Sequence, residues 1–401
     1  MNNAFEEAKP VIQTLQAHGY EAFFVGGAVR DSLLNRPIGD VDIATSARPE
    51  EVQAIFTKVI PIGIDHGTVM VRYDKQSYEV TTYRVEAEYN DYRHPDEVQF
   101  VKDIRDDLSR RDFTMNAIAM NIEGNLIDPF NGREAISLHT IKTVGNAHTR
   151  FSEDPLRMMR ALRFVSQLGF HLSEETWHAI QQNASLLTHI AVERNAVELE
   201  KLVQGTFAHQ AWNLLVDSKI GHYLPVFKND PSMMQKCKEL SWIPLDDLSE
   251  AIAVFHILYP TLSIDQWAKE WKLSNQQKRK AALLADMIHQ YDKASMAWLV
   301  YQLHEENLAA FERIAHLLSL EGEEWKYENT MRIYTRLPIY SKQQLAISGL
   351  ELKEWFHPTP PGPWMKRFLH RLEHAVVTEE LPNDREAMKE KVLEWSQREE
   401  S

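Results

Sequence analysis

The sequence predicts an α+β domain over residues 1–147 and an all-α remainder. From residue 22 to about residue 144, short runs rich in β-branched and aromatic residues alternate with helical stretches and turns. From about residue 151 onward, apolar residues recur every three or four positions, which is the period of a helix that buries one face. At 401 residues the chain is also too long for one ordinary core, so several domains are expected.

Five segments of the first domain are predicted as strands, and a helix over residues 28–34 is predicted directly after the first of them. The strand segments are residues 22–25, 41–44, 68–73, 78–82 and 117–121. In the all-α remainder, breaks are expected near Gly205, at residues 229–231 and at residues 358–363, where closely spaced prolines cannot continue a helix.

Composition places the protein among soluble, cytoplasmic chains. Cys237 is the only cysteine, so there is no internal disulfide and no thiolate zinc cluster. The first twenty residues lack the apolar core of a signal peptide, and no uncharged run approaches the ~20 residues that a membrane helix needs. The net charge of −14 opposes nonspecific nucleic-acid binding. A local basic groove stays open, because residues 142–163 hold five basic and two acidic side chains.

The first chemical motif is the pair Gly26-Gly27 between the first strand and the helix after it. Glycines let the backbone approach a ligand closely, and the first N–H groups of a helix carry a partial positive charge. Together with Arg30, this turn can hold a phosphate through Gly27 and the guanidinium. The same pattern also fits a tight turn whose glycines serve only backbone geometry.

Asp40 and Asp42 form the second motif. Residues two apart on a strand face the same side, so both carboxylates can hold Mg²⁺ together with phosphate oxygens and water. Taken alone, an Asp-x-Asp also fits a solvated strand end. Glu79, on the segment 78–82, is the candidate for a third carboxylate, and the alternative is a carboxylate at a strand edge. A Gly-Gly turn followed closely by Asp-x-Asp resembles the head of polymerase-β-like nucleotidyltransferases.

The third motif is the dense charged segment Arg110-Arg111-Asp112. Arg111 can bind a triphosphate with its forked guanidinium, and Asp112 can accept a hydrogen bond from a ribose hydroxyl. Taken alone, the segment fits better as the charged start of a helix, with Asp112 or Thr114 as the cap and Asn116 satisfying a turn.

The fourth motif is a predicted helix that begins with capping residues and Pro155 and carries Arg157, Arg160 and Arg163 along one side. Asp154 lies one turn before Arg157 on that side. The two residues either form an ordinary ion pair within the helix or present a fixed acceptor and donor to a base. Cytosine and adenine each offer an amino group beside a ring-nitrogen acceptor, so such a pair fits both of them, whereas guanine and uracil would place a carbonyl oxygen against the carboxylate.

In this order the motifs resemble one family closely, the class II tRNA nucleotidyltransferases and in particular the bacterial CCA-adding enzymes. The resemblance covers essentially the whole chain and is strongest over residues 20–165. It implies a catalytic head over 1–147, a helical neck over 148–205 that reads the base, a body over 206–300 and a tail over 301–401 that grips tRNA. It further implies template-independent addition of C, C and A to the tRNA 3′ end from CTP and ATP.

The resemblance also assigns roles to individual residues. Asp40 and Asp42 would bind the metal, and Gly27, Arg30 and Arg111 the nucleotide. Asp154 and Arg157 would read the base. Arg160 and Arg163 would support the phosphates of the nucleotide, and residues 128–132 would connect head and neck.

Relatives on the same head make other products, among them poly(A) polymerases and partial CC- or A-adding enzymes. The segment Gly63-Ile-Asp-His-Gly67 lacks the adjacent basic residues typical of the poly(A) polymerases of this class, and a polar stretch from about Arg84 to Asp96 resembles the loop that CC-adding enzymes lack. Both features favour complete CCA addition. A non-catalytic RNA-binding protein and a nucleotidyltransferase acting on a protein or small molecule are the remaining alternatives, and the sequence leaves open whether the chain forms a homodimer.

Overall fold

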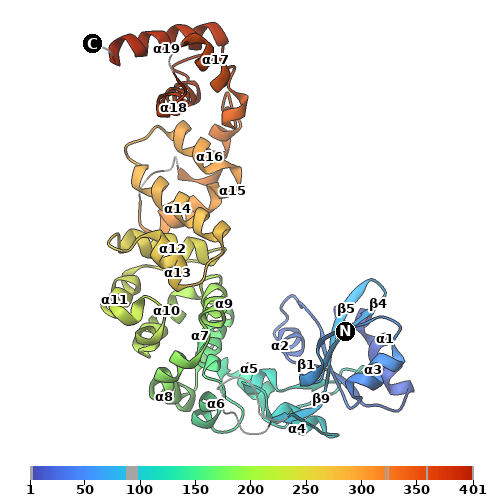
Figure 1. The fold of residues 1–401 in the computed structure, drawn as a ribbon. Coiled ribbons are helices and arrows are strands. Elements are labelled where there is room, and N and C mark those ends of the chain that lie inside the picture. The colour runs from blue at the N-terminus through green and yellow to red at the C-terminus, as the bar shows by residue number, and fades with distance from the viewer. Residues whose placement is uncertain (1–2, 87–97, 321, 323–324, 358–359, 400–401) are drawn as a thin grey trace. The chain divides into compact units, whose positions relative to one another are not determined.

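The computed structural model describes residues 3–86, 98–320, 322, 325–357 and 360–399. Within it the chain forms two compact units, Met1–Pro244 and Leu245–Ser401. In the described residues, the first unit holds the strands of the fold and eleven α-helices, and the second is built from helices (Figure 1). In the described residues, no helix is both long and apolar enough to span a membrane.

A mixed sheet of seven strands organises the start of the first unit, in the order β3-β4-β5-β2-β1-β8-β9. β2 and β5 run parallel and the other pairs run antiparallel. The register sets Val25 of β1 opposite Asp42 of β2, and Asp42 opposite Glu79 of β5. The strands are β1 (Ala22–Val25), β2 (Asp42–Thr45), β3 (Val59–Gly63), β4 (Thr68–Tyr73), β5 (Gln76–Thr82), β8 (Ala119–Met120) and β9 (Leu126–Ile127).

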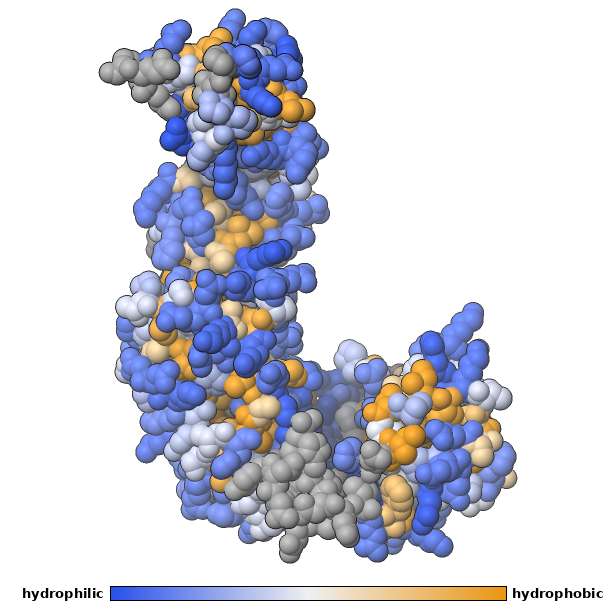
Figure 2. Space-filling model, viewed as in Figure 1, coloured by the Kyte–Doolittle hydropathy of each residue, from blue (hydrophilic) through white to orange (hydrophobic). Residues whose placement is uncertain are grey.

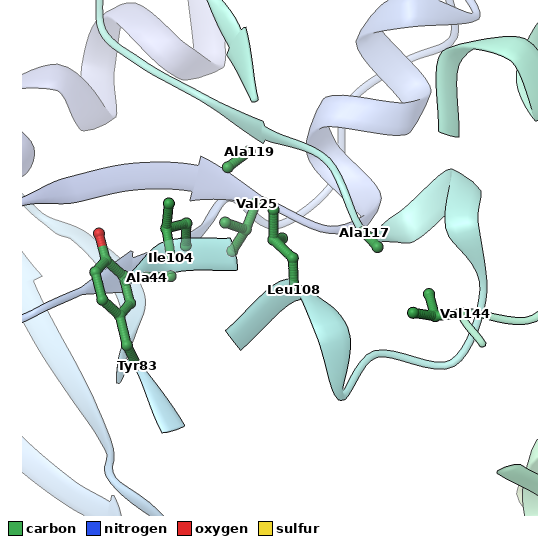
Figure 3. Packing of buried hydrophobic residues seen from close by; sticks show 8 residues of the cluster. All are labelled: Val25, Ala44, Tyr83, Ile104, Leu108, Ala117, Ala119 and Val144. Atoms are coloured by element: carbon green, nitrogen blue, oxygen red, sulfur yellow. The ribbon is translucent and has the colours of Figure 1, made fainter. Parts of the chain in front are cut away.

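Short helices cover this sheet and complete its core. α1 (Asn3–Ala17) and α3 (Pro49–Ile55) pack against the sheet, and α2 (Gly27–Leu33) follows β1 directly. On α4 (Ile104–Ser109), Leu108 points toward Val25 in the cluster of Figure 3. Tyr83 and Ala44 belong to the same cluster, so α4 is anchored beside the strands that carry the motifs. A two-stranded sheet of β6 (Arg84–Glu86) and β7 (Val98–Phe100) lies next to α4.

The rest of the first unit is mainly helical, with α7 (Leu156–Leu168) at its centre and one short strand, β11 (His171–Leu172), in the part that was predicted as all-α. α7 contacts α9 (Val192–Val203) and α10 (Ala208–Asp217), and most of its side chains are buried. At Gly205 a Cβ atom would lie 2.5 Å from the backbone carbonyl carbon of Ser166, so glycine permits this close approach. The remaining elements here are α5 (Gly132–Ser137), β10 (Thr140–Ile141), α6 (Ala147–Glu153), α8 (Glu174–Asn183) and α11 (Ser232–Glu239).

The second unit is built from helices, and three of them share a buried ion cluster. Glu250 is fully buried, and its carboxylate lies 3.3 Å from Lys280 Nζ and 2.8 Å from Arg313 Nη2. A buried carboxylate between two cations keeps its charge at a lower desolvation cost than an unpaired one. The helices are α12 (Leu248–Leu258), α13 (Ile264–Glu270), α14 (Asn275–Gln290), α15 (Met296–Leu317), α16 (Tyr327–Tyr334), α17 (Gly349–Trp355), α18 (Pro363–Val377) and α19 (Arg385–Glu399).

Hydrophilic side chains dominate the surface, and apolar ones gather in places on the first unit (Figure 2). Ile60 and Ile62 of the edge strand β3 are 46% and 50% exposed. These residues lie on the outer strand of the sheet, away from the core cluster around Val25 and Leu108.

Three local predictions are corrected by the structure. β2 begins at Asp42, so Asp40 precedes the strand and strand alternation does not place it. Arg110 is the C-cap of α4, and the short 3-10 helix after it (Thr114–Asn116) has Phe113 at its N-cap, so neither Asp112 nor Thr114 is the cap that was predicted. Asp154 lies between α6 and α7, outside the helix that carries Arg157. The polar stretch from about Arg84 to Asp96 lies mostly outside the described residues.

Candidate functional site

One pocket of the first unit, with a volume of about 1130 Å³, brings the predicted site residues together. The turn after β1, the starts of β2 and α2, and β5 line one part of it, while α7 and α9 line another. Every predicted site residue lines this pocket: Gly27, Arg30, Asp40, Asp42, Glu79, Arg111, Asp112, Asp154, Arg157, Arg160 and Arg163.

Gly26 shapes the part of the pocket next to the sheet. Its φ of +72° and ψ of −135° are a backbone conformation that residues with a Cβ rarely adopt. A Cβ atom on Gly26 would lie 3.0 Å from Arg111 Nη1 and 3.7 Å from Asp42 Oδ2. The absent side chain therefore lets a guanidinium and a carboxylate both approach the turn closely.

Carboxylates crowd the same end of the pocket. The parallel register sets Asp42 beside Glu79 on the neighbouring strand, and Asp40 lies just ahead of β2. Burial raises the pKa of Asp42 to about 6, and the charges of Glu79 and Asp40 add to the rise while Arg111 opposes it. A bound cation would relieve this repulsion.

The donor set at this point suits a hard divalent cation that completes its shell with other oxygens. Magnesium takes one or two protein carboxylates and fills the remaining positions with phosphate oxygens and water. In the described part of the chain, no three His, Cys, Asp or Glu side chains converge on a common metal position. Asp40 and Asp42 would offer magnesium two carboxylates, and substrate oxygens and water would fill its remaining positions.

The Arg111 guanidinium is bound by Asp107, a residue that was not predicted from the sequence. Asp107 of α4 is fully buried and accepts from Arg111 Nη2 at 3.3 Å and from Arg110 Nε at 2.9 Å. Arg111 Nε is buried and has no hydrogen-bond partner among the described residues. The helical spacing of three and four residues was the available signal for this contact.

Both oxygens of the Asp112 carboxylate accept hydrogen bonds. Oδ1 accepts from Phe113 N at 2.8 Å and from Asn116 Nδ2 at 3.1 Å, and Oδ2 accepts from Arg160 Nε at 2.8 Å. Burial by itself would raise the pKa of Asp112, but Arg160 and Asn116 outweigh it and hold the pKa well below its usual range. In this state Asp112 orients Arg160, and a ribose hydroxyl would have to share or replace one of these donors.

Asp154 and Arg157 do not pair with each other. Asp154 Oδ1 accepts from Leu156 N at 3.2 Å, and Asp154 Oδ2 lies 3.3 Å from Arg194 Nη2. Arg157 Nη1 donates to Glu153 Oε2 at 3.0 Å. The interpretation as an intrahelical Asp154–Arg157 ion pair is therefore wrong, and both side chains line the pocket with other partners behind them.

Neither of these partners was predicted. Glu153 lies four residues before Arg157, a spacing at which ion pairs form along a helix. Arg194 comes from α9, and its pairing with Asp154 spans 40 residues of chain. No local pattern could have revealed that contact.

Arg160 and Arg163 share a third unpredicted carboxylate, Glu198 of α9. Arg160 Nη1 lies 3.9 Å from Glu198 Oε1, and Arg163 Nε lies 3.3 Å from Glu198 Oε2. The latter contact is not aligned as a hydrogen bond, so Arg163 Nε is a buried donor without a hydrogen-bond partner in the described residues. Burial and the neighbouring Arg160 lower the pKa of Arg163 to about 10.

Arg30 enters the pocket from α2. Its Nη1 donates to Asn116 Oδ1 at 2.7 Å, and its Nε and Nη2 donate to Asp31 at 3.0 Å each. Arg30, Arg160 and Arg163 together with Arg111 place four guanidiniums around the space beside the carboxylates. The pocket thus offers a metal-binding end, a strongly cationic wall and a separate acceptor–donor pair.

Comparison with known proteins gives family matches along most of the chain. Residues 22–142 match the family described as poly A polymerase head domain, and residues 244–392 match the one described as tRNA nucleotidyltransferase domain 2. The CCA-adding enzyme of Geobacillus sp. (strain WCH70) is 47% identical over 398 residues, which cover 98% of this chain and 97% of the relative. That of Oceanobacillus iheyensis is 43% identical over 394 residues, 98% of each chain.

Solved structures agree with these matches. The CCA-adding enzyme of Bacillus stearothermophilus in complex with CTP has a TM-score of 0.89 at 41% identity, covering 100% of this chain and 99% of that one. The Thermotoga maritima CCA-adding enzyme complexed with tRNA shares the fold at 18% identity, with a TM-score of 0.63 over 98% of this chain and 94% of that one.

Proposed function

This chain belongs to the CCA-adding enzymes, a family of tRNA nucleotidyltransferases, and we propose that it adds C, C and A to the 3′ end of tRNA from CTP and ATP, releasing pyrophosphate. The observation that carries the proposal is the convergence of all the predicted residues on one pocket. Two carboxylates lie at its sheet end, and Asp154 with Arg157 lies on its helical side.

Asp40 and Asp42 are proposed to hold magnesium as a pair, with Glu79 as a neighbouring carboxylate on β5 that lies outside the metal-binding pair. When bound, the metal ions supply acidification of the attacking 3′ hydroxyl and charge neutralisation on the leaving pyrophosphate. Arg111, which like Asp42 lies next to Gly26, limits the rise in the pKa of Asp42 that burial and the neighbouring carboxylates cause. Asp107 in turn keeps Arg111 at that position.

The triphosphate is proposed to lie against the cationic wall. Arg30 and Arg111 approach from the head side of the pocket, and Arg160 and Arg163 approach from α7. Arg163 supports this proposal most directly, because its buried Nε lacks a hydrogen-bond partner and its pKa is lowered. A phosphate oxygen would accept a hydrogen bond from Arg163 Nε and would stabilise the positive charge of the guanidinium, since charge-assisted hydrogen bonds to guanidinium are strong.

Base selection is proposed to rest on Asp154 and Arg157. Arg157 is 7% exposed and braced by Glu153, and Asp154 is held by Leu156 N and by Arg194. An acceptor and a donor fixed in this way match the amino group and ring nitrogen that cytosine and adenine share. Guanine and uracil would set a carbonyl oxygen against the Asp154 carboxylate, which costs hydrogen bonds and adds repulsion.

Product identity follows from the relatives and from one local feature. The curated relatives at 43–47% identity are CCA-adding enzymes over nearly their full length. The stretch 63–67 carries no adjacent basic residues, unlike the poly(A) polymerases of this class. The division at residues 147, 205 and 300, the grip of the helical tail on tRNA, a homodimer and a cytoplasmic location stay predictions.

Product length on a truncated tRNA tests the proposal. Purified protein with Mg²⁺, labelled CTP and ATP is expected to extend a tRNA lacking CCA by three nucleotides, and a tRNA ending in CC by one. Absence of extension would refute the proposal, and a long A tail would identify a poly(A) polymerase. Asp40→Ala should abolish extension, while Asp265→Ala, at an exposed position of α13, is the matched control that should not.

The base-selection step has its own test. Asp154→Asn should loosen rejection of UTP and GTP more than it changes the Mg²⁺ concentration needed for half-maximal rate. Unchanged rejection of both nucleotides in this variant would refute the role given to Asp154 without touching the assignment of Asp40 and Asp42.

A further inference from the structure

One aromatic ring lies among three of the pocket's guanidiniums. The Phe164 ring centroid is 4.4 Å from Arg163 Cζ, 5.1 Å from Arg30 Cζ and 5.7 Å from Arg160 Cζ. Phe164 itself is 4% exposed on α7. Arg160 and Arg163 belong to the same helix, whereas Arg30 comes from α2, more than a hundred residues earlier. The ring therefore joins cations from two separate parts of the first unit.

Three cations this close repel one another, and their carboxylate partners do not remove the repulsion evenly. Arg30 is paired with Asp31 and Arg160 with Asp112 in hydrogen-bonded geometry. Among the described residues, the carboxylate next to Arg163 is that of Glu198, and this contact is not aligned as a hydrogen bond. Without further attraction, the three guanidiniums would spread apart or turn toward solvent, because isolated like charges in a buried site are costly.

The ring supplies such an attraction. The π face of an aromatic ring carries partial negative charge and attracts cations within about 6 Å of its centroid, most strongly where water is excluded. Phe113, which follows Asp112, meets the ring edge-on at 5.7 Å and an interplanar angle of 87°. This contact holds the orientation of the Phe164 ring, since edge-to-face pairs are a preferred aromatic geometry.

We propose that Phe164 is a positioning residue for polyphosphate binding: its ring keeps Arg30, Arg160 and Arg163 gathered as one cationic wall before the nucleotide arrives. The inference rests on the proposed function in one respect, that the anion received is the triphosphate of CTP or ATP. Guanidiniums that are already held together bind an anion more tightly, because the free energy needed to overcome their repulsion is supplied by folding and does not reduce the binding free energy.

An aliphatic residue of similar size separates this role from simple packing. Phe164→Leu keeps the site apolar but removes the π face. A graded version replaces Phe164 with mono-, di- and trifluorinated phenylalanine, which weakens the π face stepwise while shape and burial change little. The matched control is Phe151→Leu on α6, a phenylalanine that is 0% exposed and lies outside the pocket lining.

The measurement is binding of inorganic tripolyphosphate to the full chain by calorimetry, together with KM and kcat for CTP on tRNA lacking CCA. Phe164→Leu is expected to weaken tripolyphosphate binding and to raise the KM for CTP about tenfold, with kcat changed less. In the fluorinated series, the logarithm of the tripolyphosphate Kd should rise with each fluorine at constant melting temperature. Phe151→Leu should lower the melting temperature and leave the Kd unchanged.

Equal tripolyphosphate affinity across the fluorinated series would overturn the inference, as would a Phe164→Leu variant that loses thermal stability but keeps its Kd and KM. These outcomes differ from a failure of the proposed function. If the wild-type chain binds tripolyphosphate with the expected fluorine dependence but extends no tRNA, the role of Phe164 stands and the assigned reaction falls.

Discussion

Replacing Asp42 with asparagine should stabilise the fold while it destroys the reaction. Asp42 is partly buried beside Glu79 and Asp40, and its pKa is raised from 3.8 to about 6. A carboxyl group with a higher pKa in the folded chain binds its proton more tightly there than in the unfolded chain. The folded state therefore loses stability as the pH rises from about 4 to about 6, and the loss is complete above that range.

The size of the effect follows from the pKa shift. A rise of about two pH units corresponds to about 3 kcal/mol at neutral pH. Solvent screening of the partly exposed group makes this an upper value. The amide of Asp42→Asn resembles the protonated acid, so the variant should escape the penalty. For the first unit, residues 1–244, a gain of this size raises the melting temperature by up to about 6–10 °C.

Thermal unfolding of both proteins from pH 4 to pH 8 without metal checks the reasoning. The two melting temperatures should agree near pH 4 and separate as the pH rises to about 7. Mg²⁺ should stabilise the wild type more than the variant, since only the wild type retains both carboxylates. The rate of nucleotide addition should fall by about a thousandfold or more.

Three results would contradict this reasoning: a variant less stable than the wild type at pH 7.5, a difference that does not depend on pH, or equal stabilisation by Mg²⁺. Glu123→Gln, at an exposed turn, provides the control for a generic effect of removing one negative charge. It should shift the melting temperature little at any of these pH values.

Other parts of the chain give further predictions. Gly205→Ala should lower the free energy of unfolding by about 2 kcal/mol or more, because the new methyl would overlap the Ser166 backbone; a normal urea midpoint would contradict this. Glu250→Gln should cost the second unit up to about 3 kcal/mol, because Lys280 and Arg313 lose their buried carboxylate and keep Asp247 and Asp246 as partners, and chemical denaturation should show the loss only in that unit's transition. Arg194→Gln should raise UTP misincorporation about tenfold, because the Asp154 carboxylate loses its contact with the Arg194 guanidinium. Single-nucleotide competition assays with CTP would detect the change. Unchanged selectivity would leave Arg194 with a structural role only.

Local patterns in the sequence were sufficient for much of the head. Residues 22–25 and 68–73 were predicted as strands with the bounds that the structure has, because short apolar alternation between turn residues is a local property. The helical character of the remainder followed in the same way from its period. The motifs also named eleven of the residues that line the pocket, since each motif is a short run whose chemistry can be recognised without its surroundings.

Contacts between distant segments could not be predicted. The parallel pairing of β2 with β5 sets Glu79 beside Asp42, and only the sheet order reveals it. The Asp154–Arg157 pair, which spacing along a helix suggested, is replaced by contacts to Arg194 and Glu153, because Asp154 lies ahead of the helix and α9 brings a cation to it.

The sequence by itself determined which chemical groups are available to the site and the local elements that carry them. Only the tertiary structure decided which group each one faces, how deeply it is buried and therefore what charge it keeps. The physical reason is that propensity, turn geometry and side-chain chemistry act over a few neighbouring residues, whereas desolvation and Coulomb interactions depend on every segment that packs nearby. The raised pKa of Asp42 and the lowered pKa of Arg163 are consequences of that packing.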